Sequence, residues 1–189
     1  MKHRCQWVDM SFDDYIRYHD QEWGVPVHDD KVLFEFLTLE GAQAGLSWST
    51  ILKKRQGYHA AFSEWNVERI ASYDEGRIQR LMLNSEIVRN QLKIRSTVSN
   101  AQNFIKIQDQ LGSFDQYLWS FVDGCPVVNN FKNHQEIPAK TELSDTISKD
   151  LKNKGFKFIG STIIYAYLQA VGLVNDHTTD CFRYIEVQL

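Results

Sequence analysis

Glu40 is the clearest candidate for chemistry in this sequence, because the pattern around it predicts a buried carboxylate. Leu33, Phe36 and Leu37 recur at helical spacing, and Glu40 is the next position on the same apolar stripe. A carboxylate removed from water is costly unless it is hydrogen-bonded or paired with a cation. We therefore expect Glu40 either to titrate abnormally or to accept protons from a bound ligand.

A turn of small residues and an aromatic side chain follow this acid. Gly41 and Gly45 are expected to end the helix, and Ser47 is expected to cap a new helix that carries Trp48. Such a helix, turn and helix would place an aromatic ring near the acid, with a small-residue surface between them against which a planar ligand could lie. The alternative is an ordinary pair of core helices with one hydrogen-bonded glutamate.

Cysteine and histidine residues near the two ends of the chain have a spacing that suits a metal site. His177 and Cys181 are four positions apart, so one helical turn or a tight loop can bring both to one ion. Cys5 and His19 could complete a Cys₂His₂ tetrahedron, which would be structural and would tie the chain ends together. In the plainer alternative the cysteines are buried free thiols. The other candidate ligands are His3, His28, His59 and His134.

Length and composition are those of an ordinary globular protein. The 189 residues suffice for one core or two small lobes, and 13% of them are aromatic. The net charge of -3 argues against indiscriminate coating of nucleic acid, although it allows a local basic face. Three cysteines do not make a disulfide framework, and no segment is long and apolar enough to span a bilayer. We expect a cytoplasmic protein without a membrane partner.

The elements that must position these residues are all predicted to be helical. Apolar periodicity and capping residues favour helices, and no alternating strand pattern is present. The segment 84–88 between two of the helices is a candidate hairpin, and Leu92, Ile94, Val98 and Ala101 are expected to face the core from the helix that follows. The expected helices cover 12–19, 30–40, 47–55, 58–65, 67–73, 76–83, 90–110, 144–154 and 160–172.

Five specific motifs occur in order along nearly the whole chain. They are Arg4-Cys5-x-Trp7, Tyr18-His19-Asp20-x-Glu22-Trp23-Gly24-Val25-Pro26, Leu39-Glu40-Gly41-x-Gln43-Ala44-Gly45-Leu46-Ser47-Trp48, Gly155-Phe156-Lys157-Phe158-Ile159-Gly160 and Gly172-Leu173-Val174-Asn175-Asp176-His177. In these motifs the sequence resembles the type I 3-methyladenine DNA glycosylases. The resemblance implies an all-α, helix-hairpin-helix glycosylase fold in which residues 1–189 form a single domain of two helical lobes with the pocket between them.

The resemblance also implies a function and a set of site residues. The expected activity is excision of 3-methyladenine from alkylated double-stranded DNA by a monomeric enzyme that does not cleave the strand. Glu40 would be the catalytic, base-binding carboxylate, and one structural zinc ion would join the ends of the chain. The zinc ligands would be Cys5, His19, His177 and Cys181. The aromatic walls of the base pocket would be Trp7, Tyr15, Tyr18, Trp23 and Trp48.

Contacts to DNA are expected from the turn after Glu40 and from the hairpin region. Leu46 is the candidate wedge for the gap that a flipped base leaves. Gly45, Arg89 and Lys93 are the other candidate contacts. Two alternatives to the glycosylase are a non-catalytic module that binds alkylated purines or DNA, and a zinc-dependent hydrolase with an open metal position.

Residue 86 departs from the family pattern within the hairpin. Glu86 stands where a glycine is usual, directly before Ile87-Val88-Arg89. A negative side chain at a turn that grips a phosphate would weaken the contact with the DNA backbone. We therefore expect residues 84–89 to dock DNA less tightly than the family pattern implies.

Overall fold

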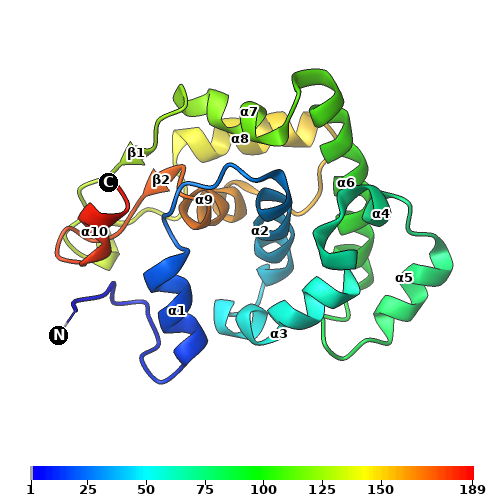
Figure 1. Cartoon of the computed structure of the whole chain (residues 1–189), viewed down its shortest axis with the longest axis horizontal. Helices are drawn as coiled ribbons and strands as arrows, with labels where there is room; N and C mark the ends of the chain where they lie inside the picture. The colour runs from blue at the N-terminus through cyan, green and yellow to red at the C-terminus, as the bar shows by residue number, and fades with distance from the viewer. Residues whose placement is uncertain (1) are drawn as a thin grey trace.

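Helix α2 lies at the centre of a mostly helical fold (Figure 1). The computed structural model describes residues 2–189. Helices α1, α3, α6, α7 and α9 all pack against α2 or against its direct neighbours. The helices are α1 (Asp13–Gln21), α2 (Asp30–Gln43), α3 (Trp48–Ala61), α4 (Val67–Ala71), α5 (Glu75–Met82), α6 (Gln91–Leu111), α7 (Phe114–Trp119), α8 (Glu142–Asn153), α9 (Ser161–Ala170) and α10 (Arg183–Glu186), with short 3₁₀ turns at Ser63–Trp65, Ser120–Val122 and His134–Glu136.

Helix α2 is buried on every side from Phe36 to Ala42. The Asp29 side chain caps it by accepting a hydrogen bond from the backbone N–H of Val32. Phe34 and Leu39 are fully buried, as are the residues of the expected inward stripe, because neighbours cover more of this helix than one face. The expected break at Gly41 is wrong, since α2 continues to Gln43. Gly41 instead allows close packing, because a Cβ there would lie 3.2 Å from the carbonyl oxygen of Phe158.

The turn between α2 and α3 follows the prediction more closely. Gly45 has a φ of +78°, a backbone conformation that favours glycine. The Ser47 hydroxyl accepts a hydrogen bond from the backbone N–H of Thr50 and so caps α3. Helix α3 then runs to Ala61, so the separate helix expected from residue 58 is the last turn of α3.

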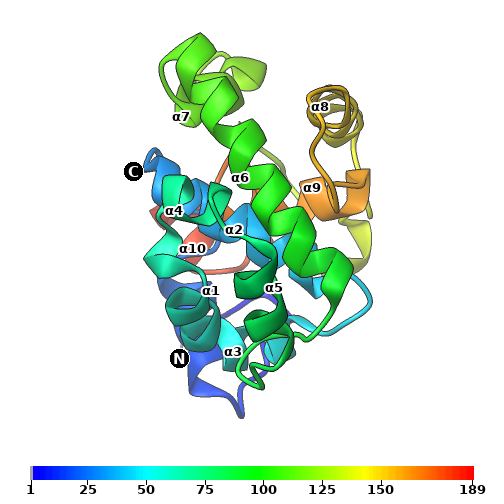
Figure 2. The same ribbon diagram turned by 90° about the vertical axis from the view of Figure 1, so that its right-hand side faces the viewer.

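Helix α6 is the longest helix of the described chain, and α4 and α5 pack beside it (Figure 2). Its N-cap is Asn90, as the sequence indicates, and Ile94 and Val98 are buried. Leu92 is 69% exposed, contrary to the expectation that it faces the core. The reason is helical spacing: Leu92 is two positions before the buried Ile94, about 200° around the helix, and so lies on the opposite face.

One pair of short strands interrupts the helical pattern near the chain ends. Strand β1 (Val127–Val128) pairs in parallel with β2 (Val174–Asn175). Two residues are too few to give a recognisable alternating pattern, so the sequence predicted no strand.

The two ends of the chain lie on the same side of the molecule (Figure 1), and the backbone N–H of Phe182 donates to the carbonyl of His3 at 3.0 Å. Within residues 2–189, none of the helices has the length and apolar character needed to cross a bilayer.

Gly57 of α3 gives a direct test of how the segment before α6 is packed. A Cβ at this position would lie 2.3 Å from the carbonyl oxygen of Glu86, so Gly57→Ala must push the backbone of that segment away. We expect a loss of about 1–3 kcal/mol in the free energy of unfolding, measured by urea denaturation.

Gly76→Ala in α5 is the matched control. Its nearest neighbouring atom would be 3.5 Å from the new Cβ, so we expect a gain of about 0.5–1 kcal/mol from helix propensity. Equal effects of the two substitutions would contradict the tight contact at Gly57.

Candidate active site

A cavity of about 400 Å³ opens beside the C-terminal half of α2. Its walls come from the N-terminal segment, α1, α2, the start of α3, the loop after β1 and α9. The five predicted aromatic residues and Glu40 all line it. The lining residues are Trp7, Tyr15, Tyr18, Trp23, Glu40, Gln43, Trp48, His134, Ile137, Pro138, Ala139, Thr162, Tyr165, Ala166 and Gln169.

The five aromatic rings form one connected cage. Trp7 packs edge-on against Tyr15 and Trp23, with ring centroids 5.5 and 4.9 Å apart. Tyr18 lies between Trp7 and Trp48, at centroid distances of 6.3 and 5.1 Å. Aromatic faces carry partial negative charge, so this cage suits a flat or positively charged group.

Glu40 is buried in this cage without a partner. Its side chain is 4% exposed, and its carboxylate receives no hydrogen bond and no ion pair from residues 2–189. Burial raises the pKa of Glu40 to about 8, so without a positively charged partner the neutral acid is favoured at neutral pH. The buried indole N–H of Trp48 also has no acceptor within the described chain. These unsatisfied groups mark the cavity as a place where a ligand would supply the missing contacts.

A second buried carboxylate nearby shows the opposite arrangement. Asp176 is fully buried and accepts hydrogen bonds from Asn129 at 2.6 Å, from Gln169 at 2.7 Å and from the hydroxyl of Tyr165. Tyr165 and Gln169 both line the cavity, so Asp176 holds that wall in place. The sequence reasoning missed this wall, although Thr162, Tyr165, Ala166 and Gln169 share one face of α9 at helical spacing.

The four candidate DNA contacts differ in their surroundings. Leu46 is 41% exposed in the turn after α2, next to Gly45. Arg89 is exposed and makes no side-chain hydrogen bond or ion pair with residues 2–189. Lys93 is half-buried, and its ammonium group donates to the carbonyls of Ala42 and Ala44 at 2.8 and 2.6 Å. The exposed leucine and arginine are therefore available to a ligand, whereas the lysine is engaged within the protein.

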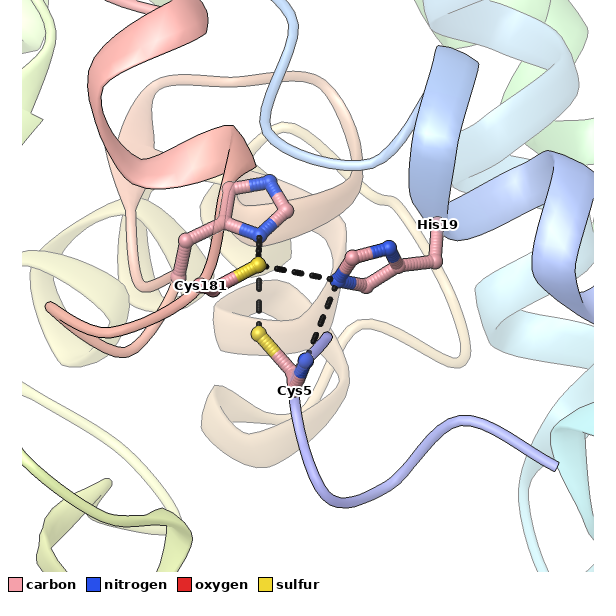
Figure 3. A group of neighbouring side chains, drawn as sticks. Cys5, His19 and Cys181 are labelled. Carbon is pink, nitrogen blue, oxygen red and sulfur yellow. Dashed lines mark hydrogen bonds between the residues drawn. The ribbon is translucent and has the colours of Figure 1, made fainter. Parts of the chain in front are cut away.

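Behind the cage, the four predicted metal ligands form one buried cluster. Cys5, His19 and Cys181 converge from the N-terminal segment, α1 and the C-terminal segment (Figure 3), and His177 completes the set. His177 Nδ1 lies 3.5 Å from each of the two sulfur atoms, and His19 Nε2 lies 3.4 Å from that of Cys181. A tetrahedral zinc ion with Zn–S and Zn–N bonds of about 2.3 and 2.0 Å places neighbouring S and N atoms about 3.5 Å apart. The donor set and its spacing therefore fit a metal ion.

The remaining nitrogen of each histidine is also bonded, as metal-binding histidines require. His19 Nδ1 donates to Asp20 at 2.8 Å, and Arg4 holds that carboxylate through two hydrogen bonds of 2.8 and 2.7 Å. His177 Nε2 lies 3.0 Å from the carbonyl oxygen of Trp23. These partners leave His19 Nε2 and His177 Nδ1 facing the sulfur atoms. The pairing of the thiols lowers the pKa of Cys181, whose thiolate accepts from Cys5.

The cluster and the cage share a wall. The ring of Trp23 packs edge-on against His177 at a centroid distance of 4.6 Å, and the ring of Trp7 packs against His19 at 5.3 Å. Together, the helical fold, the caged acid and the adjoining Cys/His cluster define a pocket whose shape and charge suit a flat, electron-poor ring system.

The chain belongs to the methyladenine glycosylase family, whose model matches residues 7–184. It is 45% identical over 181 residues to DNA-3-methyladenine glycosylase 1 of Escherichia coli (strain K12), with 96% of each chain covered. It resembles a crystal structure of 3-methyladenine DNA glycosylase I with a TM-score of 0.93, at 47% identity over 95% of this chain and 98% of the other. A variant of such an enzyme in complex with 3-methyladenine gives a TM-score of 0.92 at 37% identity, over 95% and 96% of the two chains.

The free energy of unfolding should depend on pH because of the buried Glu40. Because the folded state holds a proton on Glu40 up to pH about 8 and the unfolded state releases it near pH 4.5, stability should fall as pH rises between these values. We expect the difference in unfolding free energy between the wild type and Glu40→Gln to change by up to about 1.4 kcal/mol per pH unit in this window. Urea denaturation of both proteins from pH 4 to 9 measures it, and a constant difference would show that Glu40 titrates normally.

Proposed function

We propose that this protein excises 3-methyladenine from alkylated double-stranded DNA by hydrolysing the N-glycosidic bond. The observation that carries the proposal is the Glu40 carboxylate, buried in an aromatic cage without any partner of its own. The relatives are named for this activity, and one related structure is titled as a complex with 3-methyladenine. The reacting base is out of reach inside a duplex, so the nucleotide must first be extruded into the pocket.

Recognition would rest on the charge of the damaged base. In DNA, 3-methyladenine is a cation, and the rings of Trp48 and Tyr18 offer it their negative faces. The Glu40 carboxylate would add an opposite charge and accept the protons of the exocyclic amino group. Ordinary adenine is neutral and would not repay the cost of ionising Glu40 in the cage, which burial makes large. Discrimination between the two bases is therefore electrostatic.

Bond cleavage requires little more from the protein, because the positively charged base is already a good leaving group. As the glycosidic bond breaks, positive charge develops on the sugar, and the Glu40 carboxylate would stabilise it from within the site. A water molecule then completes the hydrolysis. No strand cleavage is expected, because a lyase needs an amine nucleophile and no lysine is among the described residues that line the cavity.

DNA docking and the overall architecture complete the proposal. We assign residues 84–89 and the start of α6 as a helix-hairpin-helix element that contacts the DNA backbone, with Arg89 as the exposed cation. Leu46 would fill the gap in the duplex. Residues 1–189 would act as one domain with two helical lobes around the pocket. We propose that the protein acts in the cytoplasm as a monomer. A second subunit is not needed to form the cavity, since one chain supplies the residues that line it.

We assign zinc to the Cys/His cluster, in a structural role. Four protein ligands satisfy a tetrahedral ion and leave no position for water or substrate. Cys5 and His19 would be joined by this ion to His177 and Cys181, which fixes the ends of the chain behind the pocket.

Release of the base tests the enzymatic activity. The wild type should release free 3-methyladenine from methylated duplex DNA and leave the strand intact, whereas Glu40→Gln should lower the single-turnover rate by about 10²- to 10³-fold while remaining folded. Chromatography of the released base and denaturing electrophoresis of the strand measure the two outcomes.

Glu68→Gln is the matched control, because it makes the same chemical change at an exposed position of α4. It should leave the rate unchanged. A wild type that binds the methylated DNA without releasing base would instead be a non-catalytic binding module.

Metal removal tests the structural assignment. Cys5→Ala and His177→Ala should each lose zinc, measured by elemental analysis, and should lower the thermal midpoint of unfolding because the chain ends are no longer joined. Cys125→Ala changes an exposed thiol and should retain both metal and stability. A Cys5→Ala protein that stays fully stable but loses activity would point to a catalytic metal.

A further inference from the structure

The half-buried Lys93 of α6 connects this helix to the turn after α2 through its ammonium group. We propose that Lys93 is a positioning residue that locks the turn carrying Leu46 onto the start of α6, so that the base pocket and the DNA-docking segment keep a fixed spacing. This inference rests on the proposed function. It replaces the sequence-based expectation that the Lys93 ammonium group contacts a DNA phosphate.

The geometry supporting this role is a helix cap supplied from another element. The ammonium group of Lys93 donates to the carbonyl oxygens of Ala42 and Ala44, at 2.8 and 2.6 Å. These carbonyls belong to the C-terminal end of α2, where backbone oxygens lack helical partners and partial negative charge accumulates. Helix α2 has no basic residue in its own last turn, so the charge that stabilises this end comes from α6.

The same lysine is fixed at its own end of the contact. Its backbone N–H donates to the Asn90 side chain at 3.1 Å, which is the N-cap of α6. Its carbonyl accepts from the hydroxyls of Ser96 and Thr97 at 2.7 and 3.0 Å. Lys93 therefore connects two well-ordered points: the cap of α6, directly after the segment 84–89, and the carbonyls on either side of Gln43.

The turn held in this way carries the residues that must act in register. Gln43 lines the cavity, and Glu40 lies in the last turn of the same helix. Leu46 projects from the turn with 41% of its surface exposed, and the neighbouring Gly45 gives the turn little stiffness of its own. Without Lys93, the turn could move relative to α6. Leu46 would then no longer be aligned with the gap in the duplex that is left when the nucleotide flips out.

A phosphate contact and a positioning role predict different results for Lys93→Met. In the positioning role, the single-turnover excision rate on duplex DNA falls about ten- to a hundredfold, because a displacement of about 1 Å is enough for such a loss. The salt dependence of duplex binding stays that of the wild type, since the ammonium group already faces two carbonyls. Lys93→Arg, which keeps the charge and the donors, should recover most of the lost rate.

Arg89→Met is the comparison. Loss of this exposed cation should reduce the slope of log affinity against log salt by about one. The same reduction for Lys93→Met, together with an unchanged excision rate, would overturn the proposal. Excision by the wild type is measured in the same assay. If the wild type released no base, the proposed function would fail, whereas a deficit confined to Lys93→Met concerns this inference alone.

Chemical reactivity of the wild type provides a test that does not depend on the folding of a variant. Lys93 should be acetylated much more slowly than the exposed Lys149 in the free protein. Acetylation of Lys93 as fast as that of Lys149 would show that its ammonium group is free for phosphate.

Discussion

The unsatisfied burial of Glu40 is the constraint on which the rest of the site depends. A carboxylate in a cage of rings destabilises the folded chain unless a ligand compensates it. The surrounding helices tolerate this cost because α2 is packed on all sides and cannot turn the side chain outward. Asp176, which lies behind the cavity wall formed by Tyr165 and Gln169, shows that the fold readily satisfies a buried acid where three donors are available. The absence of donors around Glu40 is thus a property of the pocket rather than of the fold in general.

Local patterns in the sequence revealed the parts of this site that follow from helical spacing and capping. The inward position of Glu40, the cap at Ser47 and the capped start of α6 each depend on a few neighbouring residues. Spacing proposed Trp48 and the four metal ligands, and the family resemblance selected those ligands over the rival histidines. The remaining aromatic walls came from the resemblance alone, because Trp7 and Trp48 reach the same cavity only through tertiary packing. Gly41 was misread for a related reason: the contact that it permits is with Phe158, which is remote in the sequence.

The role of Lys93 illustrates the same limit for charged residues. A run of cations near a candidate hairpin favours a phosphate contact when only the sequence is considered. In the structure, two backbone carbonyls occupy the Lys93 ammonium group, and Lys54 likewise donates to the carbonyl of Ser85 at 2.6 Å. Carbonyl partners carry no signature in the sequence, so the number of cations available to DNA is smaller than the composition indicates. Arg89 is then left with a larger share of the electrostatic contact.

The closure of the chain near Cys5 and Cys181 has a mechanical consequence. Because the two ends meet at one cluster, a force that pulls them apart acts first on that cluster. The rings of Trp7 and Trp23 pack against its histidines, so such a force would reach the cavity through these two rings. The same closure means that the ends could be joined by a short linker and the chain reopened at the exposed turn around Gly124, with little change to the packing of α2.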